Sequence, residues 1–197
     1  MVEVSKIERA FAAIDAANAA DPRSIEVKGE MIPYELAYGR RMTAALTHFA
    51  PASAPPLQLA ARAQHLERWM IPRADYPMDR VGYFNWRNDQ KKRHAARAEE
   101  LLLPLGFTTE TVDRVKFLLE KKKLKKDPDT QTLEDVICLV FLQHYALDFA
   151  GDHPEEKVIS ILQKTWGKMS AAGQAAALEL SLPPEVGQLV TKALADE

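Results

Sequence analysis

The sequence predicts an all-α protein, a single-domain bundle of about eight helices. Apolar residues recur at helical spacing in nearly every segment, and no convincing pair of strands is found. Proline-rich breakers and capping residues divide these segments and leave only short connections between them. The 197 residues, 47% hydrophobic and 27% charged, suffice for one domain with a full core over residues 1–197.

The first half of the chain contains four predicted helices. A hairpin-like excursion around Gly29 is expected after the first helix, and Pro33 is typical of the first turn of the second. The breaker "APASAPP" precedes the third helix, and the loop "IPRADYPMD" follows it. The expected helices cover about residues 5–20, 33–49, 57–70 and 79–103.

Four more helices are predicted in the second half. "TTETVDRV" supplies the cap of a helix that runs into the lysine-rich "LEKKKLKK", and "DPDTQT" is expected to be a loop. The segment "LEDVICLVFLQHYALDFA" is apolar on most sides, which predicts the central helix of the bundle. The expected helices cover about residues 108–126, 133–150, 152–170 and 181–197.

Charge and cysteine content argue against a nucleic-acid-binding, membrane or secreted protein. The net charge is −2, so no overall field attracts nucleic acid or a membrane surface, and an anion site requires local clustering. The N-terminal segment is too acidic for a signal peptide, and no apolar run approaches the ~18 residues of a membrane span. The single cysteine, Cys138, lies in an apolar run and is expected to be buried, which favours a reducing, cytoplasmic setting.

Three polar side chains occur on helices where an apolar core is expected, namely His65, His94 and Asp135. Histidine and aspartate are ligands that divalent metals take in hydrolytic sites. The three residues lie on separate predicted helices, so only packing would bring them together. Each also has a structural explanation: a hydrogen-bonded core histidine, a solvated histidine, and a first-turn acid that forms a capping box with Thr132.

Basic residues gather in two places. Five lysines end the fifth predicted helix, more than are needed to offset the helix dipole: Lys121, Lys122, Lys123, Lys125 and Lys126. Arg68, Arg73 and Arg87 surround the proline-containing loop, and arginine suits bidentate binding of phosphate or carboxylate. One interpretation is a site for an anion such as a nucleotide or sugar phosphate, and the other is a solvated surface.

Aromatic residues concentrate in the same region of the sequence. Trp69, Tyr76, Tyr83, Phe84 and Trp86 could stack on a base, or they could form the core beneath a long loop. Several signatures of known chemistry do not occur in the sequence. It has no glycine-rich phosphate loop, no paired-cysteine zinc pattern and no G-x-S-x-G element.

Three segments resemble successive elements of the HD superfamily of metal-dependent phosphohydrolases: "LAARAQH", "HAARAEELLLPLGF" and "LEDVICLVFL". The resemblance implies an HD-like helical fold. It also implies a divalent metal held by His65 and Asp135, with His94 nearby.

The metal-binding pattern of that superfamily is degenerate in this sequence. Tyr38 stands where the superfamily has its first histidine, and Gln64 and His65 stand at its His-Asp dyad. Glutamine and tyrosine are poor ligands for a divalent ion. Glu35 or Glu67 could supply a substitute carboxylate.

The whole chain resembles, more closely, an uncharacterised domain-of-unknown-function family (four-two-zero-two). The segments that carry this resemblance are "AAIDAANAADP", "ELAYGRRMT", "QHLERWMIPRADYPMDRVGYFNWR", "KKKLKKDPDTQTLEDVICLVFLQHY" and "KTWGKMS". It implies no established activity.

Two classes of function follow. The first is a metal-dependent phosphohydrolase acting on a nucleotide or another small phosphorylated compound, and the alternative is a non-catalytic HD-like protein that binds an anionic metabolite or nucleotide. RNA binding is disfavoured by the negative net charge, and no membrane is expected as a partner. The predicted site residues are Glu67, Arg68 and Lys123 as catalytic groups, Arg68, Trp69, Arg73, Tyr76, Arg87, Lys122 and Lys126 as substrate-binding groups, and His65, His94 and Asp135 as metal ligands.

Overall fold

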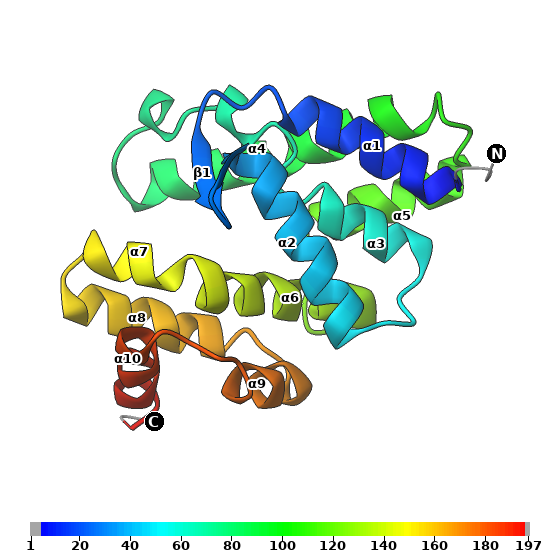
Figure 1. Cartoon of the computed structure of the whole chain (residues 1–197). Helices are drawn as coiled ribbons and strands as arrows, with labels where there is room; N and C mark the ends of the chain where they lie inside the picture. Colours follow the sequence, from blue (N-terminus) through cyan, green and yellow to red (C-terminus); the bar gives the residue numbers. More distant parts are fainter. Residues whose placement is uncertain (1–4, 196–197) are drawn as a thin grey trace.

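A computed structural model describes residues 5–195 and confirms the all-α prediction, with one short hairpin (Figure 1). In the first half, strands β1 and β2 pair antiparallel, with Ile25 opposite Ile32, as the sequence around Gly29 predicts. The elements of this half are α1 (Lys6–Asn18), β1 (Ser24–Val27), β2 (Glu30–Pro33), α2 (Tyr34–Phe49), α3 (Pro55–Arg62) and α4 (Arg80–Leu102).

The second half is entirely helical in the part of the chain that the structure describes. Its elements are α5 (Thr109–Leu119), α6 (Pro128–His144), α7 (Ala146–Gly151), α8 (Glu155–Trp166), α9 (Ala171–Leu178) and α10 (Pro184–Ala195). None of the described helices has both the length and the apolar character needed to cross a membrane.

Side-chain caps begin several helices, and the one at α5 lies in the segment "TTETVDRV" that the sequence predicts to supply it. Ser5 and Glu8 form a capping box at α1, and Thr108 caps α5 by accepting a hydrogen bond from the backbone of Thr111. Asp79 caps α4 in the same way. Such caps each contribute about 1 kcal/mol to helix stability.

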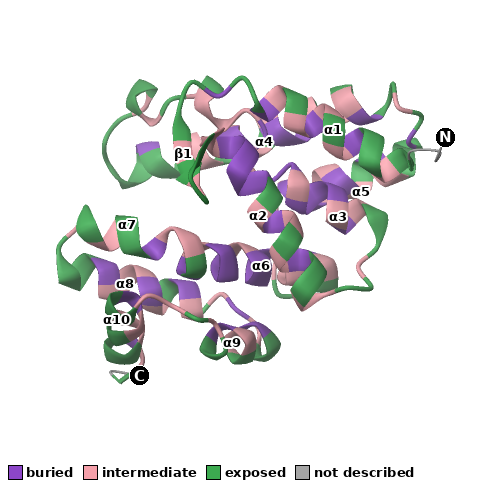
Figure 2. Cartoon of the chain, viewed as in Figure 1, coloured by how far each residue is buried: buried purple, intermediate pink, exposed green. Residues whose placement is uncertain are grey.

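Two apolar cores lie on opposite sides of α6. Its residues Val136 and Val140 join the first core, which α1 to α5 complete, whereas Cys138 and Leu142 face the second core with α8 to α10. Figure 1 shows α6 and α7 below α1, α2 and α3, with α8 to α10 on the other side. The buried face of α6 in Figure 2 agrees with its prediction as the central helix.

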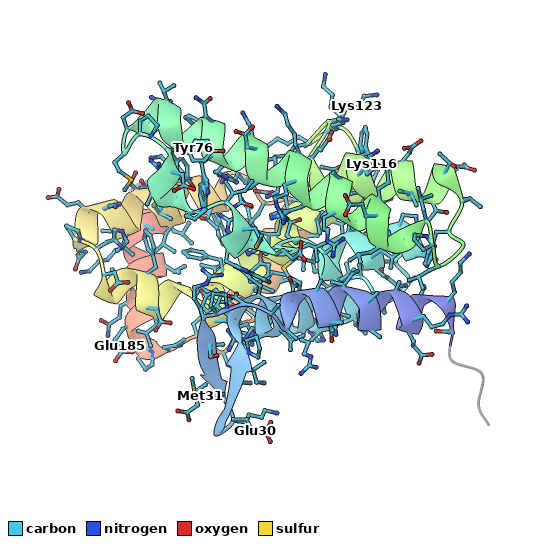
Figure 3. The ribbon with its side chains drawn as sticks, turned by 90° about the horizontal axis from the view of Figure 1, so that it is seen from above. Glu30, Met31, Tyr76, Lys116, Lys123 and Glu185 are labelled. Atoms are coloured by element: carbon cyan, nitrogen blue, oxygen red, sulfur yellow. The ribbon has the colours of Figure 1, made fainter. Side chains whose placement is uncertain are left out.

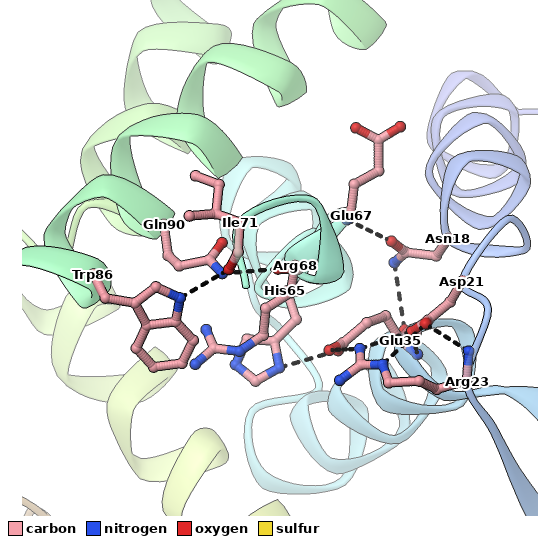
Figure 4. Close-up of polar contacts among 10 residues, drawn as sticks. All are labelled: Asn18, Asp21, Arg23, Glu35, His65, Glu67, Arg68, Ile71, Trp86 and Gln90. Atoms are coloured by element: carbon pink, nitrogen blue, oxygen red, sulfur yellow. Dashed lines mark hydrogen bonds and ion pairs between the residues drawn. The ribbon is translucent and has the colours of Figure 1, made fainter. Parts of the chain in front are cut away.

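The third predicted helix ends at Arg62, eight residues earlier than expected. The chain then passes through Glu67, whose backbone is left-handed at φ 51°, and through two short 3₁₀ turns, residues 68–70 and 73–75. Tertiary hydrogen bonds replace helical ones here. The side-chain amide of Gln90 donates to the carbonyls of Arg68 and Ile71 at 2.8 and 2.9 Å, and Asn18 accepts from the Glu67 amide at 2.8 Å (Figure 4). The local apolar pattern could not show these partners.

The lysine-rich segment is a connection rather than the end of α5, because Lys121, Lys123 and Lys125 all have left-handed backbone. The segment "DPDTQT", expected to be a loop, is instead the first part of α6. Asp127 caps this helix, and both it and Asp129 pair with Arg114.

Two further predictions in the second half need correction. The helix expected over residues 133–150 is divided at Tyr145 into α6 and α7. The sequence analysis also missed α9, whose alanine-rich segment Ala171–Leu178 lacks a clear apolar stripe.

Candidate functional site

A large cavity of about 370 Å³ lies between α2, α6 and the connection after α3. Five basic side chains line it but only two acidic ones, in a chain whose net charge is −2. Aromatic rings and the Cys138 thiol complete its walls. The charged lining residues are Arg23, Arg68, Arg87, Lys121, Lys168, Glu35 and Glu134.

The guanidinium groups of Arg68 and Arg87 have no carboxylate partner and no hydrogen-bond acceptor among residues 5–195. Arg68 lies over the ring of Trp86 at 4.5 Å, and Arg87 lies 5.7 Å from the ring centre of Tyr83. Burial lowers the pKa of Arg68, although the nearby Glu35 charge opposes this shift. Guanidinium groups remain charged in proteins, so these two groups bring fixed positive charge that no direct ion pair neutralises in the described residues.

Lys121 and Glu134 form a buried ion pair in the wall of the cavity. The lysine Nζ lies 2.6 Å from the glutamate Oε2, with side chains only 11% and 5% exposed. Burial opposes ionisation of Glu134, but the Lys121 charge outweighs it, and the pKa of this carboxyl lies below its usual value. The pair therefore stays ionised, and Lys168, 4.0 Å from the other carboxylate oxygen, adds a second cation.

Glu35 is the other carboxylate of the cavity, and its side chain is 1% exposed. Arg23 donates to it at 2.9 Å, and the Nδ1 atom of His65 lies 3.2 Å from Oε2 (Figure 4). Asp21 receives the amide of Glu35 at 3.1 Å and also binds Arg23. Burial raises the pKa of Glu35 to about 7, although Arg23 and Arg68 oppose the shift. Glu35 is therefore a carboxyl that can gain a proton near neutral pH.

The His65 ring is held in place from two sides. Tyr38 stacks on it, with ring centres 3.9 Å apart, while Glu35 binds Nδ1. Burial, followed by the charge of Arg68, lowers the pKa of His65 well below its usual value, and burial does the same for His94. Both rings are thus neutral at pH 7, and their centres lie 6.2 Å apart.

Among residues 5–195, Asp135 does not join His65 and His94 in a group that could hold a metal, because its carboxylate is bound by other residues. Its carboxylate accepts from the Ser170 amide at 2.8 Å, from the Ser170 hydroxyl at 2.6 Å and from Gln131 at 3.0 Å. A side chain at Gly173 would come within 2.7 Å of this carboxylate, so glycine lets α9 approach it. Asp135 therefore anchors the start of α9, and it is not a first-turn acid, since α6 begins at Pro128.

The residues of the site do not fit a divalent metal of the kind that the HD resemblance implies. No group of three or more His, Cys, Asp or Glu side chains in residues 5–195 is placed to hold such an ion. Arg68 and Lys121 line the cavity beside His65 and would repel a cation.

Substitution of Asp135 tests its structural role. We expect Asp135→Ala to lower the free energy of unfolding by about 2–3 kcal/mol, because Asp135 is buried and the hydrogen bonds to its carboxylate are lost. Urea unfolding followed by circular dichroism measures the loss. Asp113→Ala, an exposed substitution on α5, is the matched control and should change stability by less than about 0.5 kcal/mol. An Asp135→Ala protein as stable as this control would contradict the assignment.

The structure brings together only some of the predicted site residues. Arg68, Arg87, His65 and His94 line the cavity or the smaller one beside it. The Glu67 side chain points away from His65 and Arg68 (Figure 4), and it pairs with Arg93 and Arg97.

The other predicted substrate-binding and catalytic residues lie outside both cavities. Lys123 is exposed at the edge of the molecule, and its side chain is directed outward (Figure 3). Lys122 pairs with Glu120, while Lys126 is exposed. Trp69 lines neither cavity.

Arg73 and Tyr76 are occupied by the proline-containing loop. Arg73 donates to the carbonyls of Tyr76 and Pro77 at 3.0 and 2.7 Å, and the Tyr76 hydroxyl donates to Asp89 at 2.9 Å. Their hydrogen bonds shape the loop that precedes α4.

Sequence analysis did not assign several residues of the site. Lys121 was noted only as part of the lysine run, and Glu35 and Tyr38 only at degenerate metal positions. Arg23 and Lys168 carried no sequence signal, since isolated charged residues are common on helices and loops, and Glu134 was not singled out. The run of adjacent charged residues Glu134 and Asp135 in the most apolar helix was the one available indication of buried charge.

Comparison with known proteins identifies the family of the chain. The family model of a domain of unknown function, DUF4202, matches residues 8–190. No curated protein and no solved structure matches the chain. The match spans most of the sequence and includes every residue that lines the two cavities. The chain therefore belongs to the DUF4202 family.

Proposed function

We propose that this protein binds a small phosphorylated compound, such as a nucleotide or sugar phosphate, in the large cavity and without a metal ion. The observation that carries the proposal is the pair of guanidinium groups, Arg68 and Arg87, that line the cavity without an anionic partner in the described chain. Unneutralised charge in a partly buried site costs free energy unless a ligand of opposite charge compensates it.

The positions of the other cations support a phosphate rather than a single carboxylate. Lys121 lies in the connection between α5 and α6 and Lys168 in the connection between α8 and α9, whereas Arg68 follows α3 and Arg87 lies on α4. The cations thus reach the cavity from four separate parts of the chain. A phosphate group has several oxygens that accept hydrogen bonds, and arginine binds two of them at once. The apolar and aromatic walls, which include Tyr38 and Phe141, suit the remainder of a small molecule.

The titration of Glu35 provides a test of anion binding. The groups that face Glu35 are Asp21, Arg23, His65 and Arg68. As pH falls from 8 to 6, Glu35 gains a proton near its pKa of about 7, and the cavity loses a negative charge. We expect the affinity for sulfate, which stays doubly charged over this range, to rise roughly fivefold. Isothermal titration calorimetry across this pH range measures the effect.

Two variants decide whether Glu35 causes the pH dependence. Glu35→Gln keeps one oxygen that accepts from Arg23 and places an amide NH2 beside Nδ1 of His65, but it cannot ionise. Its sulfate affinity should therefore be constant between pH 6 and 8. Glu100→Gln, on an exposed residue of α4, should retain the wild-type dependence. Absence of measurable sulfate or phosphate binding to the wild type at any pH would refute the proposed function.

The contact between Glu35 and His65 favours a second candidate, metal-independent hydrolysis of a phosphate ester. With Nδ1 bound to Glu35, the other ring nitrogen of His65 is free to accept a proton from water. The water oxygen would bond to phosphorus while the ester bond breaks, and the leaving oxygen would take a proton from solvent. Phosphate release from a panel of nucleotides and sugar phosphates in the presence of EDTA, abolished by His65→Ala, would establish this activity.

A further inference from the structure

A smaller cavity of about 200 Å³ adjoins the large one and extends it toward α4. The two share His65, Arg68, Arg87, Lys121 and Ile137 in their walls. A ligand held by the shared cations can therefore reach into both. The residues that line only this inner cavity are Gln64, Tyr83, Gln90, Lys91 and His94.

Three residues that line the inner cavity each carry a buried polar atom with no hydrogen-bond partner among the described residues. These atoms are Oε1 of Gln64, Oε1 of Gln90 and Nε2 of His94. These residues are only 5%, 1% and 2% exposed. Buried polar groups in proteins are nearly always paired, so three unpaired atoms around one cavity indicate a missing partner.

All three atoms act as hydrogen-bond acceptors. The Gln90 amide nitrogen donates to two backbone carbonyls, those of Arg68 and Ile71, and this settles which end of the amide is free. The His94 ring hydrogen-bonds to the backbone of Gln64. A neutral imidazole that donates through one nitrogen accepts through the other, so Nε2 is an acceptor. Oε1 of Gln64 is the third.

The charges around the inner cavity exclude a cation as the missing partner. Arg68, Arg87, Lys91 and Lys121 line it, and no carboxylate does. A metal ion or an ammonium group would meet this positive potential without compensation. An uncharged group that carries N–H or O–H donors satisfies the three acceptors and avoids the repulsion.

We propose that the inner cavity binds the uncharged, hydrogen-bond-donating part of the phosphorylated ligand, either the amino edge of a nucleobase or the hydroxyls of a sugar. The inference rests on the proposed function, because the phosphate of the same molecule lies with Arg68 and Arg87. It adds a specificity-determining role for Gln64, Gln90 and His94. The 200 Å³ volume is sufficient for one base or one hexose ring.

The test compares ligands that differ only in the group expected in the inner cavity. Calorimetry on the full chain would use inorganic phosphate, AMP and glucose 6-phosphate as probes. At least one of the two organic phosphates should bind ten-fold or more tightly than inorganic phosphate. Preference for AMP assigns a base to the inner cavity, and preference for glucose 6-phosphate assigns a sugar.

Two variants remove the acceptors and leave the phosphate site intact. Gln64→Met and His94→Phe should each weaken the preferred organic phosphate about ten-fold and change inorganic phosphate by less than twofold. Gln143→Met and His48→Phe, both on exposed residues, are the matched controls. The ligand-free Gln64→Met protein should melt at a higher temperature than the wild type, because an unpaired buried acceptor is gone.

The outcomes distinguish failure of the phosphate site from failure of the inner site. No binding of any phosphate to the wild type overturns both of them. If inorganic phosphate binds as tightly as both organic phosphates, or if the variants weaken all probes equally, the inner site is overturned while the phosphate site stands. Unchanged melting of Gln64→Met would also count against an unpaired acceptor at that position.

Discussion

Arg68→Met should weaken sulfate or phosphate binding by roughly 30-fold, which corresponds to about 2 kcal/mol for a charge-assisted hydrogen bond to a guanidinium. Arg68 lines both cavities and has no protein anion to hold it in residues 5–195. Methionine keeps much of the apolar stem over Trp86 and removes only the charge. The free energy of unfolding should therefore stay within about 1 kcal/mol of the wild type, because the native protein loses an uncompensated charge.

Arg80→Met is the control for this substitution. Arg80 is exposed and lies over the ring of Phe84 at 5.7 Å. Like Arg68 it contacts an aromatic ring, but unlike Arg68 it lines neither cavity. Calorimetric titration with sulfate and urea unfolding measure the two quantities. Equal sulfate affinity in Arg68→Met and the wild type would remove the main support for the proposed anion site.

Lys121→Met should lower the free energy of unfolding by about 3 kcal/mol, because it leaves the buried Glu134 carboxylate without its nearest cation. Lys168 compensates only in part, since its ammonium lies 4.0 Å from that carboxylate. Lysine and methionine both have a Cβ, so the strain of the left-handed backbone at position 121 is the same in the variant and in the wild type. Urea unfolding monitored by circular dichroism measures the loss.

The double variant Lys121→Met/Glu134→Met separates the charge effect from packing. Removal of both partners leaves no isolated charge, so most of the lost stability should return. Sulfate affinity should remain below that of the wild type in both variants, because Lys121 lines both cavities. A double variant as unstable as the single one would show that the lysine stem, not its charge, supports the fold.

The all-α architecture was predictable because helical period, caps and breakers are local properties. The cap at Thr108 lies in the segment predicted to supply it, and the capping box at Ser5 stands where the first helix is predicted to begin. The third helix was predicted too long because its end depends on Gln90 and Asn18, which are distant in sequence. Apolar periodicity carries no information on such partners.

The candidate site was predictable only in part. Arg68, Arg87 and the two histidines stood out because charged groups interrupt apolar helices or cluster near a loop. Asp135 stood out for the same reason, yet its charge is used to anchor α9. From the sequence alone, a buried aspartate that caps a helix looks the same as one that faces a cavity.

The large cavity lies where a bound ligand would affect how easily the C-terminal helices separate from the rest of the molecule. The first core contains α1 to α5, and the second contains α8 to α10. The large cavity lies between them: Glu35 and His65 line it from the side of the first core, and Thr165 and Lys168 line it from the side of the second. Without a ligand, the C-terminal helices can open as a cooperative unit of their own, with faster amide hydrogen exchange than the core around Met42. If the proposed anion site is occupied, a ligand between Arg68 and Lys168 should join the two units, and we expect the exchange of α8 and α9 to slow in proportion to ligand occupancy.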